Sequence, residues 1–381
     1  MRTIAVVTGT RAEYGYLKPL MQAIQQENQL TLLPLITGMH LLPEFGNTDQ
    51  VVRDDFPNAV TIPMPLNGDD LKDMALYLAA GINSFATYFD SHRPDLIMVL
   101  GDRSEPLAAA LAALYLNIPI AHINGGDVTG GTLDESIRHC LTKIAHIHFV
   151  HTKTNAERVH KMGEEKKRIF VTGALTLDAI LHLPLLSKKE IFQKYTLDEQ
   201  QTTFLVVHHP ITTLKDQGYS EMNALLQTLD TLKKQTVLLY PNCDAGGKRF
   251  ISLIQQYEKK PYLHVIKNMP HREYLSLLKS VDVVIGNSSS GIIEAPSFNI
   301  PVINIGMRQQ GRERSDNILD VEAKKDRLIA AIDTALHNDA FAKKVQHTKN
   351  KFGRGDAAQQ IINVLKTIPL DETLIRKQII Y

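Results

Sequence analysis

Residues 1–15, MRTIAVVTGTRAEYG, begin with a short apolar run and pass directly into a polar turn. We predict a β-strand at Ile4–Val7, a turn at Thr8–Gly15 and a helix at Tyr16–Gln26, where apolar residues recur every three or four positions. Strand, polar turn and helix in this order form the repeating unit of a parallel α/β sheet. The stretch lacks the apolar core and small-residue cleavage site of a signal peptide.

The same rhythm recurs along both halves of the chain. In the first half the predicted strands are Leu32–Thr37, Leu96–Leu100, Pro119–Ile123, Ile147–His151 and Ile169–Thr172, with helices that include Leu71–Asp90 and Glu105–Leu116. In the second half they are Thr203–Val207, Val237–Tyr240, His264–Ile266, Val283–Ile285 and Val302–Ile305. Because these runs are almost continuously apolar, we predict parallel sheets that helices cover on both faces.

The length of 381 residues predicts two domains, at roughly 150 residues each. A polar, lysine-bearing break at Lys188–Gln201 divides the two series of strands. We therefore predict an α/β protein with two doubly wound, Rossmann-like domains, residues 1–187 and 188–356, that face a central cleft. The pattern leaves open whether the segment 357–381, with its helix at Ala357–Ile368, packs back on the first domain.

Composition excludes several classes of protein. Hydrophobic residues make up 44% of the chain, and 42 Lys and Arg balance 41 Asp and Glu, so intrinsic disorder is excluded. This balance gives no electrostatic reason for a nucleic-acid or membrane partner. No apolar run approaches the ~20 residues that span a bilayer. Two cysteines, Cys140 and Cys243, fit a reducing compartment, and we expect a soluble, cytoplasmic protein.

Polar clusters follow nearly every predicted strand. In parallel α/β sheets, ligands bind beyond the carboxyl ends of the strands, because loops and helix N-termini converge there. The coincidence predicts one ligand cleft between the two domains. The clusters are TGTRAEYG (8–15), TGMH (37–40), GDR (101–103), HINGGD (122–127), VHHP (207–210), PNCDAGGK (241–248), GNSSSG (286–291) and GMRQQGRER (306–314).

GNSSSGIIEA, residues 286–295, is the most informative of these clusters. The backbone N–H groups and dipole at a helix start suit a phosphate, the hydroxyls of Ser288 and Ser289 add donors, and Glu294 can accept from a ribose hydroxyl. A serine-rich N-cap is the structural alternative. The motif is not a Walker A loop, because no GK[ST] follows.

Basic residues at two strand exits are candidate phosphate ligands. Arg308, closest to its strand, and Arg11 can clamp a phosphate through several donors, whereas Arg312 and Arg314 fit a solvated loop. His208 and His209 follow another strand, where an imidazole can bond a diphosphate or carry a proton, and His40 has a similar position.

Candidate acid–base groups come from the first half of the chain. Asp102 ends an apolar strand, and Asp127, Asp134 and Glu135 occupy a glycine-rich loop and the helix start after it. Such carboxyls can serve acid–base catalysis, but Asp102 could instead form a turn and Asp134 could cap a helix at 136–144. The histidines at 146, 148 and 151 share no strand face, so we expect no metal site.

The ordered motifs together resemble the UDP-N-acetylglucosamine 2-epimerase family, in particular its hydrolysing branch in sialic-acid synthesis. The likeness runs from TGTRAEYG to GMRQQGR and includes GDR, IRHCLTK (137–143), HHP, PNCDAGGK and GNSSSGIIE in order. It implies two Rossmann domains like those of B-type glycosyltransferases, with the nucleotide held mainly by the second. It also suggests a homo-oligomer, a dimer or a tetramer.

The resemblance implies a site for a UDP-sugar and a reaction without metal or other cofactor. The C2 proton is removed and UDP leaves, and water then adds to the glycal-type intermediate with inverted stereochemistry at C2, which releases free N-acetylmannosamine. The residues implied around UDP are Arg11, His209, Asn242, Lys248, Ser288, Ser289, Glu294 and Arg308, with Arg103 as a further substrate ligand. Those implied toward the sugar are His40, Asp102, Asp127 and Glu135.

One residue departs from the family pattern. Many relatives carry a glutamate within HI-x-GG, where this chain has Asn124. If that glutamate is an essential acid elsewhere, Asp127 or Glu135 must serve here, or the Asn124 amide must position water. The alternative substrate is UDP-2,4-diacetamido-2,4,6-trideoxyglucose, of legionaminic-type pathways. Two further alternatives are a B-type glycosyltransferase and a non-catalytic nucleotide-sugar sensor.

Overall fold

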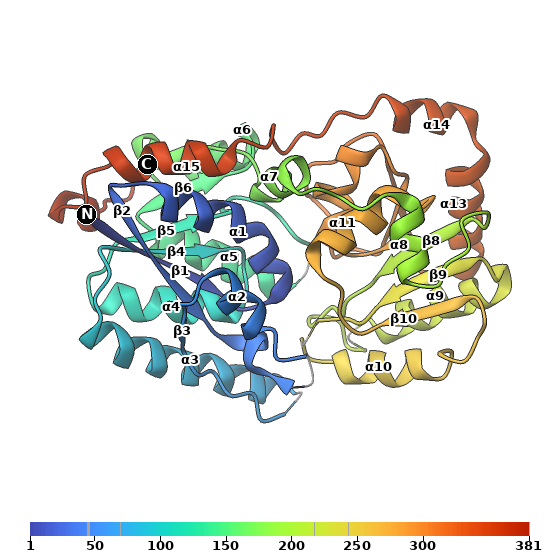
Figure 1. Cartoon of the computed structure of the whole chain (residues 1–381), viewed down its shortest axis with the longest axis horizontal. Helices are drawn as coiled ribbons and strands as arrows, with labels where there is room; N and C mark the ends of the chain where they lie inside the picture. The colour runs from blue at the N-terminus through green and yellow to red at the C-terminus, as the bar shows by residue number, and fades with distance from the viewer. Residues whose placement is uncertain (44–45, 69, 131, 217, 243, 381) are drawn as a thin grey trace. The chain divides into compact units, whose positions relative to one another are not determined.

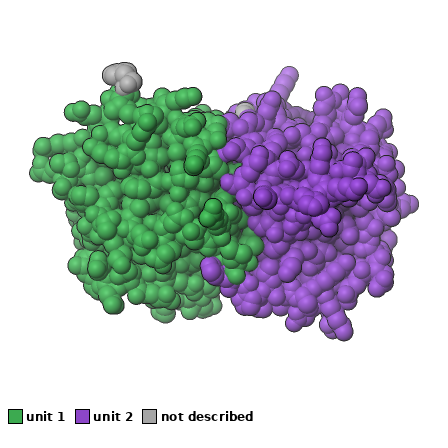
Figure 2. Space-filling view, turned by 90° about the horizontal axis from the view of Figure 1, so that it is seen from above, with its two compact units in different colours: residues 1–127, 134–181, 352–381 green, residues 128–133, 182–351 purple. Residues whose placement is uncertain are grey.

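The computed structural model describes the chain except for residues 44–45, 69, 131, 217, 243 and 381. The described chain forms two compact units, which Figure 2 distinguishes by colour. Unit 1 comprises residues 1–127, 134–181 and 352–381, and unit 2 comprises residues 128–133 and 182–351. The main boundary between units therefore falls at Leu181 and His182, and the C-terminal segment belongs to unit 1.

Unit 1 is built on a seven-stranded parallel sheet in the order β3-β2-β1-β4-β5-β6-β7. The strands are β1 (Arg2–Thr8), β2 (Leu30–Ile36), β3 (Val60–Thr61), β4 (Leu96–Leu100), β5 (Ile120–Ile123), β6 (Ile147–Val150) and β7 (Ile169–Val171). The order reverses at β1, and β1 and β4 are neighbours, which creates the switch point of a doubly wound sheet.

Two apolar cores cover the faces of this sheet. Alternate residues of β1 point to opposite faces: Ile4 and Val6 pack with α1 (Arg11–Gln26) and α15 (Ala357–Thr367), and Ala5 and Val7 pack with α3 (Leu71–Ser91) and α4 (Ser104–Tyr115). Figure 1 shows these two helical layers. The remaining helices of the unit are α2 (Asp49–Asp55), α5 (Leu133–Ile144), α6 (Lys153–Lys161), α7 (Leu175–His182) and α16 (Glu372–Ile375), with short 3₁₀ turns η1 (Gly38–Leu41) and η3 (Lys166–Arg168).

Unit 2 has a six-stranded parallel sheet in the order β10-β9-β8-β11-β12-β13. The strands are β8 (Thr203–Val207), β9 (Gln235–Leu239), β10 (Leu263–Ile266), β11 (Val283–Gly286), β12 (Val302–Ile305) and β13 (Ile318–Val321). The helices are α8 (Lys188–Lys194), α9 (Tyr219–Leu232), α10 (Gly247–Gln255), α11 (His271–Ser280), α12 (Ser289–Ile293), α13 (Lys325–His337) and α14 (Asp339–Gln346), with the turn η4 (Ala295–Phe298). Both sheets confirm the predicted fold class.

Three local features differ from the picture that the sequence gives. The strands β3 and β13 were not expected, because β3 is only two residues long and Asp320 interrupts the apolar run of β13. The polar break at 188–201 contains α8, which begins with a capping box between Ser187 and Glu190 and buries Ile191 and Phe192. Asp134 is not a cap residue, since α5 already begins at Leu133.

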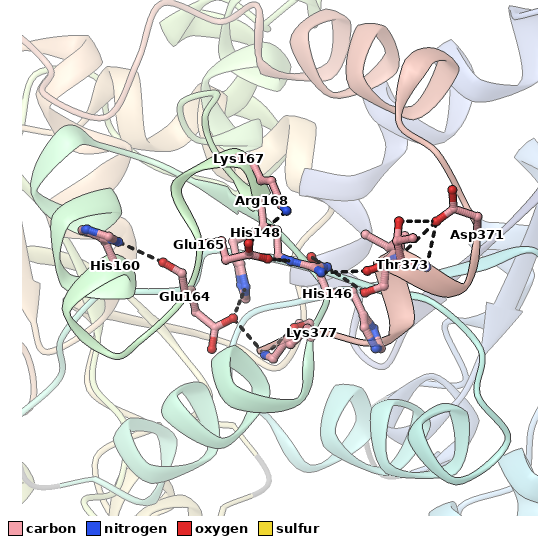
Figure 3. Close-up of polar contacts among 12 residues, drawn as sticks. His146, His148, His160, Glu164, Glu165, Lys167, Arg168, Asp371, Thr373 and Lys377 are labelled. Carbon is pink, nitrogen blue, oxygen red and sulfur yellow. Dashed lines mark hydrogen bonds and ion pairs between the residues drawn. The ribbon is translucent and has the colours of Figure 1, made fainter. Parts of the chain in front are cut away.

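The C-terminal segment is tied to unit 1 by a network of buried polar groups (Figure 3). Lys377 Nζ donates to the carbonyl of Ala145 at 2.7 Å and pairs with Glu164 at 2.9 Å, and Arg168 donates to the carbonyl of Leu374 at 2.7 Å. The segment therefore contributes to the polar interior of unit 1 as well as to its apolar core.

Among the described residues, no helix combines the length and the apolar character that crossing a lipid bilayer requires.

Candidate functional site

Arg138 gathers the acidic candidates of unit 1. Asp102 follows β4, Asp127 follows β5, and Glu135 and Arg138 lie one turn apart on α5. The Arg138 guanidinium pairs with the Asp102 carboxylate, donates to Glu135 Oε2 at 2.8 Å and reaches the carbonyl oxygen of Asp127 at 3.3 Å. The structure thus brings together three of the predicted residues through one that was not predicted.

The charge of this cluster determines what it can do. The Arg138 side chain is fully buried, and although burial lowers its pKa, the carboxylates of Asp102, Asp127 and Glu135 raise it overall. A guanidinium at this distance stabilises the ionised form of a carboxylate. Because Asp102 and Glu135 share it, both suit the role of a proton acceptor. His139 Nε2 lies 2.9 Å from the second oxygen of Glu135.

Asn124 has a backbone conformation that explains its residue type. Its φ of 75° is in the left-handed region, which asparagine tolerates better than most residues. The turn lets the chain leave β5 and reach Asp127. Among the described residues, no group forms a hydrogen bond with the buried Asn124 Oδ1. This amide is available to a ligand or a water molecule.

His40 is fully buried and is held on both sides by threonine hydroxyls. Its Nε2 lies 3.1 Å from Thr8 Oγ1 and its Nδ1 lies 2.8 Å from Thr48 Oγ1. Burial lowers its pKa to about 4, so the ring is neutral at physiological pH. These contacts favour a supporting role for His40 in the turn after β2 over proton transfer to a sugar.

Two arginine candidates of unit 1 occupy helix starts. Arg11 is the first residue of α1, after the Thr10 N-cap. Arg103 precedes α4, and its Nε lies 3.5 Å from Glu105. Both follow central strands of the sheet, at the edge that also holds Asp102.

Asn287 organises the corresponding edge of unit 2. Its side-chain amide bonds both backbone groups of His209, accepting from the N–H at 2.8 Å and donating to the carbonyl at 2.9 Å. Its own carbonyl accepts from Arg308 at 3.1 Å and from Gln309 at 2.9 Å. Three predicted ligands therefore meet around Asn287, since His209 Nδ1 also accepts from the backbone of Asn242 at 3.2 Å.

The serine motif forms a capped helix start, as the structural alternative predicted. Ser288 is the N-cap of α12, and its hydroxyl accepts from the Ser290 N–H at 3.3 Å. Ser288 and Ser289 are half-buried, so their remaining polar capacity can still face a ligand. Glu294 is fully buried and lies 3.3 Å from His271 Nε2.

The other basic candidates differ in placement. Lys248 is exposed at the start of α10. Arg312 is only 5% exposed, so its assignment to a solvated loop is wrong, and Arg314 pairs with Asp320 at 2.9 Å.

Cys140 is an exposed free thiol, and Cys243 lies outside the described residues. Within the described part of the chain, no three metal-binding side chains converge.

Arg138 and Asn287 are the residues that sequence analysis missed. Arg138 lies one helical turn after Glu135 in the predicted helix, and a search for arginines on the same helix face could have found it. Asn287 lies inside GNSSSG but was passed over in favour of the serines. Its contacts to His209 and Arg308 join residues far apart in sequence, so only the fold reveals them.

Residues 22–366 match the sequence model of the family described as UDP-N-acetylglucosamine 2-epimerase. The chain is 36% identical to the UDP-N,N'-diacetylbacillosamine 2-epimerase (hydrolyzing) of Legionella pneumophila, over 99% of both chains. It is 37% identical to the GDP/UDP-N,N'-diacetylbacillosamine 2-epimerase (hydrolyzing) of Campylobacter jejuni, over 84% of both. The UDP-GlcNAc 2-epimerase structure from Neisseria meningitidis has a TM-score of 0.80 at 20% identity, and the match covers 95% of this chain and 99% of that one.

The chain belongs to the UDP-N-acetylglucosamine 2-epimerase family. It is an enzyme, a nucleotide-sugar 2-epimerase of the hydrolysing type. Its two-unit α/β architecture is the fold of that family.

Proposed function

We propose that this enzyme hydrolyses and epimerises UDP-N,N'-diacetylbacillosamine, which is UDP-2,4-diacetamido-2,4,6-trideoxyglucose. The observation that carries the proposal is the 36% identity over 99% of both chains to a relative named for this substrate. The relatives support this substrate, the alternative of the sequence analysis, better than UDP-N-acetylglucosamine. The products are UDP and 2,4-diacetamido-2,4,6-trideoxymannose.

The carboxylates of unit 1 supply the base. The C2 proton of the sugar is weakly acidic, so its removal needs an aligned and ionised acceptor. Asp102 and Glu135 meet this requirement because Arg138 stabilises their charge. As the C2–H bond breaks, a C1–C2 double bond forms and the bond from C1 to the UDP oxygen breaks.

The polar edge of unit 2 binds the departing UDP. Arg308 and the serines of GNSSSG offer cationic, hydroxyl and N–H stabilisation to the diphosphate, and Glu294 is proposed to accept from a ribose hydroxyl. No redox step is involved, and the proposed reaction uses no cofactor. Asn242 and Lys248 remain candidate ligands of the nucleotide.

Water completes the reaction. Its hydroxyl adds to C1 of the glycal-type intermediate, and a proton adds to C2. The new C2 proton arrives on the face of the sugar opposite to the face from which the first proton was removed. The free amide oxygen of Asn124 can orient a polar group of the sugar or this water. Asp127 stays a candidate for proton return, because its carboxyl lies in the same cluster.

The test compares two substrates in the absence of NAD, metal and acceptor. We expect UDP-N,N'-diacetylbacillosamine to yield UDP and the free manno sugar at a higher kcat/KM than UDP-N-acetylglucosamine, with deuterium from D₂O incorporated at C2. Asp102→Asn should remove turnover and leave UDP affinity within severalfold, whereas the exposed Asp90→Asn serves as the control. Preference for UDP-N-acetylglucosamine would contradict the proposed substrate, and so would UDP-N,N'-diacetylbacillosamine that binds but is not turned over.

Two properties of the whole protein remain predictions. We expect it to act in the cytoplasm, because its substrate is a nucleotide sugar, and to form a dimer or a tetramer. Size-exclusion chromatography with light scattering measures the second property directly.

A further inference from the structure

Glu105 is a fully buried carboxylate at the edge of unit 1 that carries the candidate site, and it has no place in the reaction described above. It is the second residue of α4, three residues after Asp102. Its Oε1 accepts a hydrogen bond from the Tyr77 hydroxyl at 2.8 Å, and its Oε2 lies 3.5 Å from Arg103 Nε. The ion pair with Arg103 explains how a charged carboxylate can lie at a position that solvent does not reach.

The turns after two other strands pack directly on this side chain. A Cβ at Gly9, after β1, would lie 2.8 Å from Glu105 Cγ, and a Cβ at Gly38, after β2, would lie 2.6 Å from the same atom. Only glycine therefore fits at either position without displacing Glu105. These turns lead into Arg11 and His40. The Glu105 carboxylate therefore contacts the turns that follow three strands, β1, β2 and β4.

A second buried carboxyl, Glu13, completes the arrangement. Its Oε2 accepts a hydrogen bond from the Gly9 N–H at 2.6 Å. Burial raises the pKa of Glu13 to about 8; the Gly9 bond lowers it, Glu105 raises it and Arg103 lowers it. Glu13 is therefore protonated at pH 7, whereas the pairing with Arg103 assigns the negative charge to Glu105.

Charged groups of the turn after β4 and of α4 act on the Glu13 carboxyl in opposite directions. Glu105 of α4 and Arg103 of the preceding turn are the charged groups that act on Glu13 from outside its own helix. The nearby His40 is neutral at physiological pH, and Tyr77 of α3 contacts Glu105 through its hydroxyl. Two carboxyls and one guanidinium thus carry a net charge of zero while Glu13 is protonated.

We propose that Glu105 is a positioning residue of the unit 1 site, which keeps Arg103 and the turns before Arg11 and His40 in place while the neighbouring Glu13 carboxyl stays uncharged. The proposal rests on the proposed function only in assuming that this edge acts on the sugar. Loss of the Glu13 proton puts two negative charges beside one arginine, which loosens the turns and repels an anionic substrate.

Enzyme activity provides the first test. Glu105→Gln keeps the shape and the acceptor for Tyr77 but removes the charge. We expect kcat/KM to fall at least about tenfold, because small displacements of the residues that bind the substrate slow the reaction by this much or more. Because Glu105 raises the pKa of Glu13, the alkaline decline of kcat/KM should also move about one unit to lower pH. In Glu13→Gln this alkaline decline should disappear, and the exposed Glu157→Gln should change neither quantity.

The pair can also be observed without any substrate. Infrared difference spectra recorded across pH 6–10 should contain a protonated carboxyl band that Glu13→Gln abolishes and Glu105→Gln moves to lower pH. If Glu105→Gln does not fold, Tyr77→Phe replaces it: it removes one bond and no charge, so kcat/KM should fall with the alkaline decline unmoved.

Two results would overturn the proposal. One is wild-type kcat/KM with an unmoved alkaline decline in Glu105→Gln, and the other is the lack of a Glu13-dependent carboxyl band. If the wild-type enzyme acts on neither UDP-sugar, the proposed function is contradicted instead, and the infrared measurement would still show whether Glu13 is protonated and whether Glu105 raises its pKa.

Discussion

Single buried residues join the loops at each sheet edge of this enzyme. Arg138 links two loops and a helix of unit 1 through the carboxylates of Asp102 and Glu135 and the carbonyl of Asp127. Asn287 links three loops of unit 2 through four hydrogen bonds. Such supporting residues fix the orientation of the groups that bind a ligand, and their loss misplaces several groups together. Substitution of Asn287 should therefore affect His209 and Arg308 at once.

Arg308→Ala should weaken UDP binding by about 1.5–3 kcal/mol, because a charge-assisted contact to phosphate is lost. Isothermal titration calorimetry with UDP measures the change. Arg308→Lys keeps the positive charge but loses the planar set of N–H donors, so its UDP affinity should lie between those of wild type and Arg308→Ala. The exposed Arg327→Ala is the matched control. Equal affinity of wild type and Arg308→Ala would remove Arg308 from the nucleotide site.

At the scale of the element, α5 is fixed at both of its ends. Its first turns present Glu135 and Arg138 to the site. At its other end, Lys377 donates to the carbonyls of Lys143 and Ala145, which satisfies acceptors that a helix C-terminus leaves open and places a cation at the negative end of the dipole. Lys377 lies on the C-terminal segment, so the helix that carries the site depends on residues far along the chain (Figure 3).

Glu164 makes this anchoring depend on pH. Its burial raises the pKa, but bonds from His148, Lys143 and Lys377 lower it to about 2, below the ordinary value of 4.5. The group therefore stabilises the folded state fully above pH 4.5, and the stabilisation is lost as the pH falls through about 2. Glu164→Gln should cost about 2–3 kcal/mol at neutral pH.

Urea unfolding of wild type and Glu164→Gln between pH 7 and pH 2 measures this difference. The gap in free energy of unfolding should narrow between pH 4.5 and pH 2, and Glu157→Gln should show no gap at any pH. A gap that is independent of pH would mean that Glu164 acts through packing and not through its charge.

The elements themselves were largely predictable from the sequence. Apolar runs flanked by turn residues located β4, β8 and β12 at their observed bounds, because buried parallel strands carry strong and local signals. The sequence did not predict the two-residue β3 or the polar α8, because neither has enough apolar residues to show a periodic pattern. Motifs at strand exits identified Asp102 and Arg308, but the partners Arg138, Asn287 and Glu105 depend on contacts between separate loops.

At the scale of the whole molecule, unit 1 is assembled from both ends of the sequence. Helix α15 packs on α1 through residues such as Ile361 and Leu365, and Arg2 donates to the Leu365 carbonyl at 2.6 Å. Unit 2 is formed by one long stretch, residues 182–351, with a short segment from the loop after β5. The two units therefore have separate cores and can lose stability separately.

Ile361→Ala should destabilise unit 1 by about 2–5 kcal/mol, since the side chain is fully buried. Hydrogen exchange followed by mass spectrometry should show faster exchange in β1 and α1 and unchanged exchange in β8 and β11. Ile332→Ala, in the core of unit 2, should produce the reverse pattern. Faster exchange in both sheets for either variant would show that the units unfold together.

The return of residues 352–381 to unit 1 bears on how the protein is made. The ribosome synthesises unit 2 before α15, so the apolar face of α1 stays uncovered while more than half of the chain is made. An exposed apolar surface of this kind invites aggregation and chaperone binding. The time that the ribosome takes from α1 to α15 therefore sets how long this surface stays exposed.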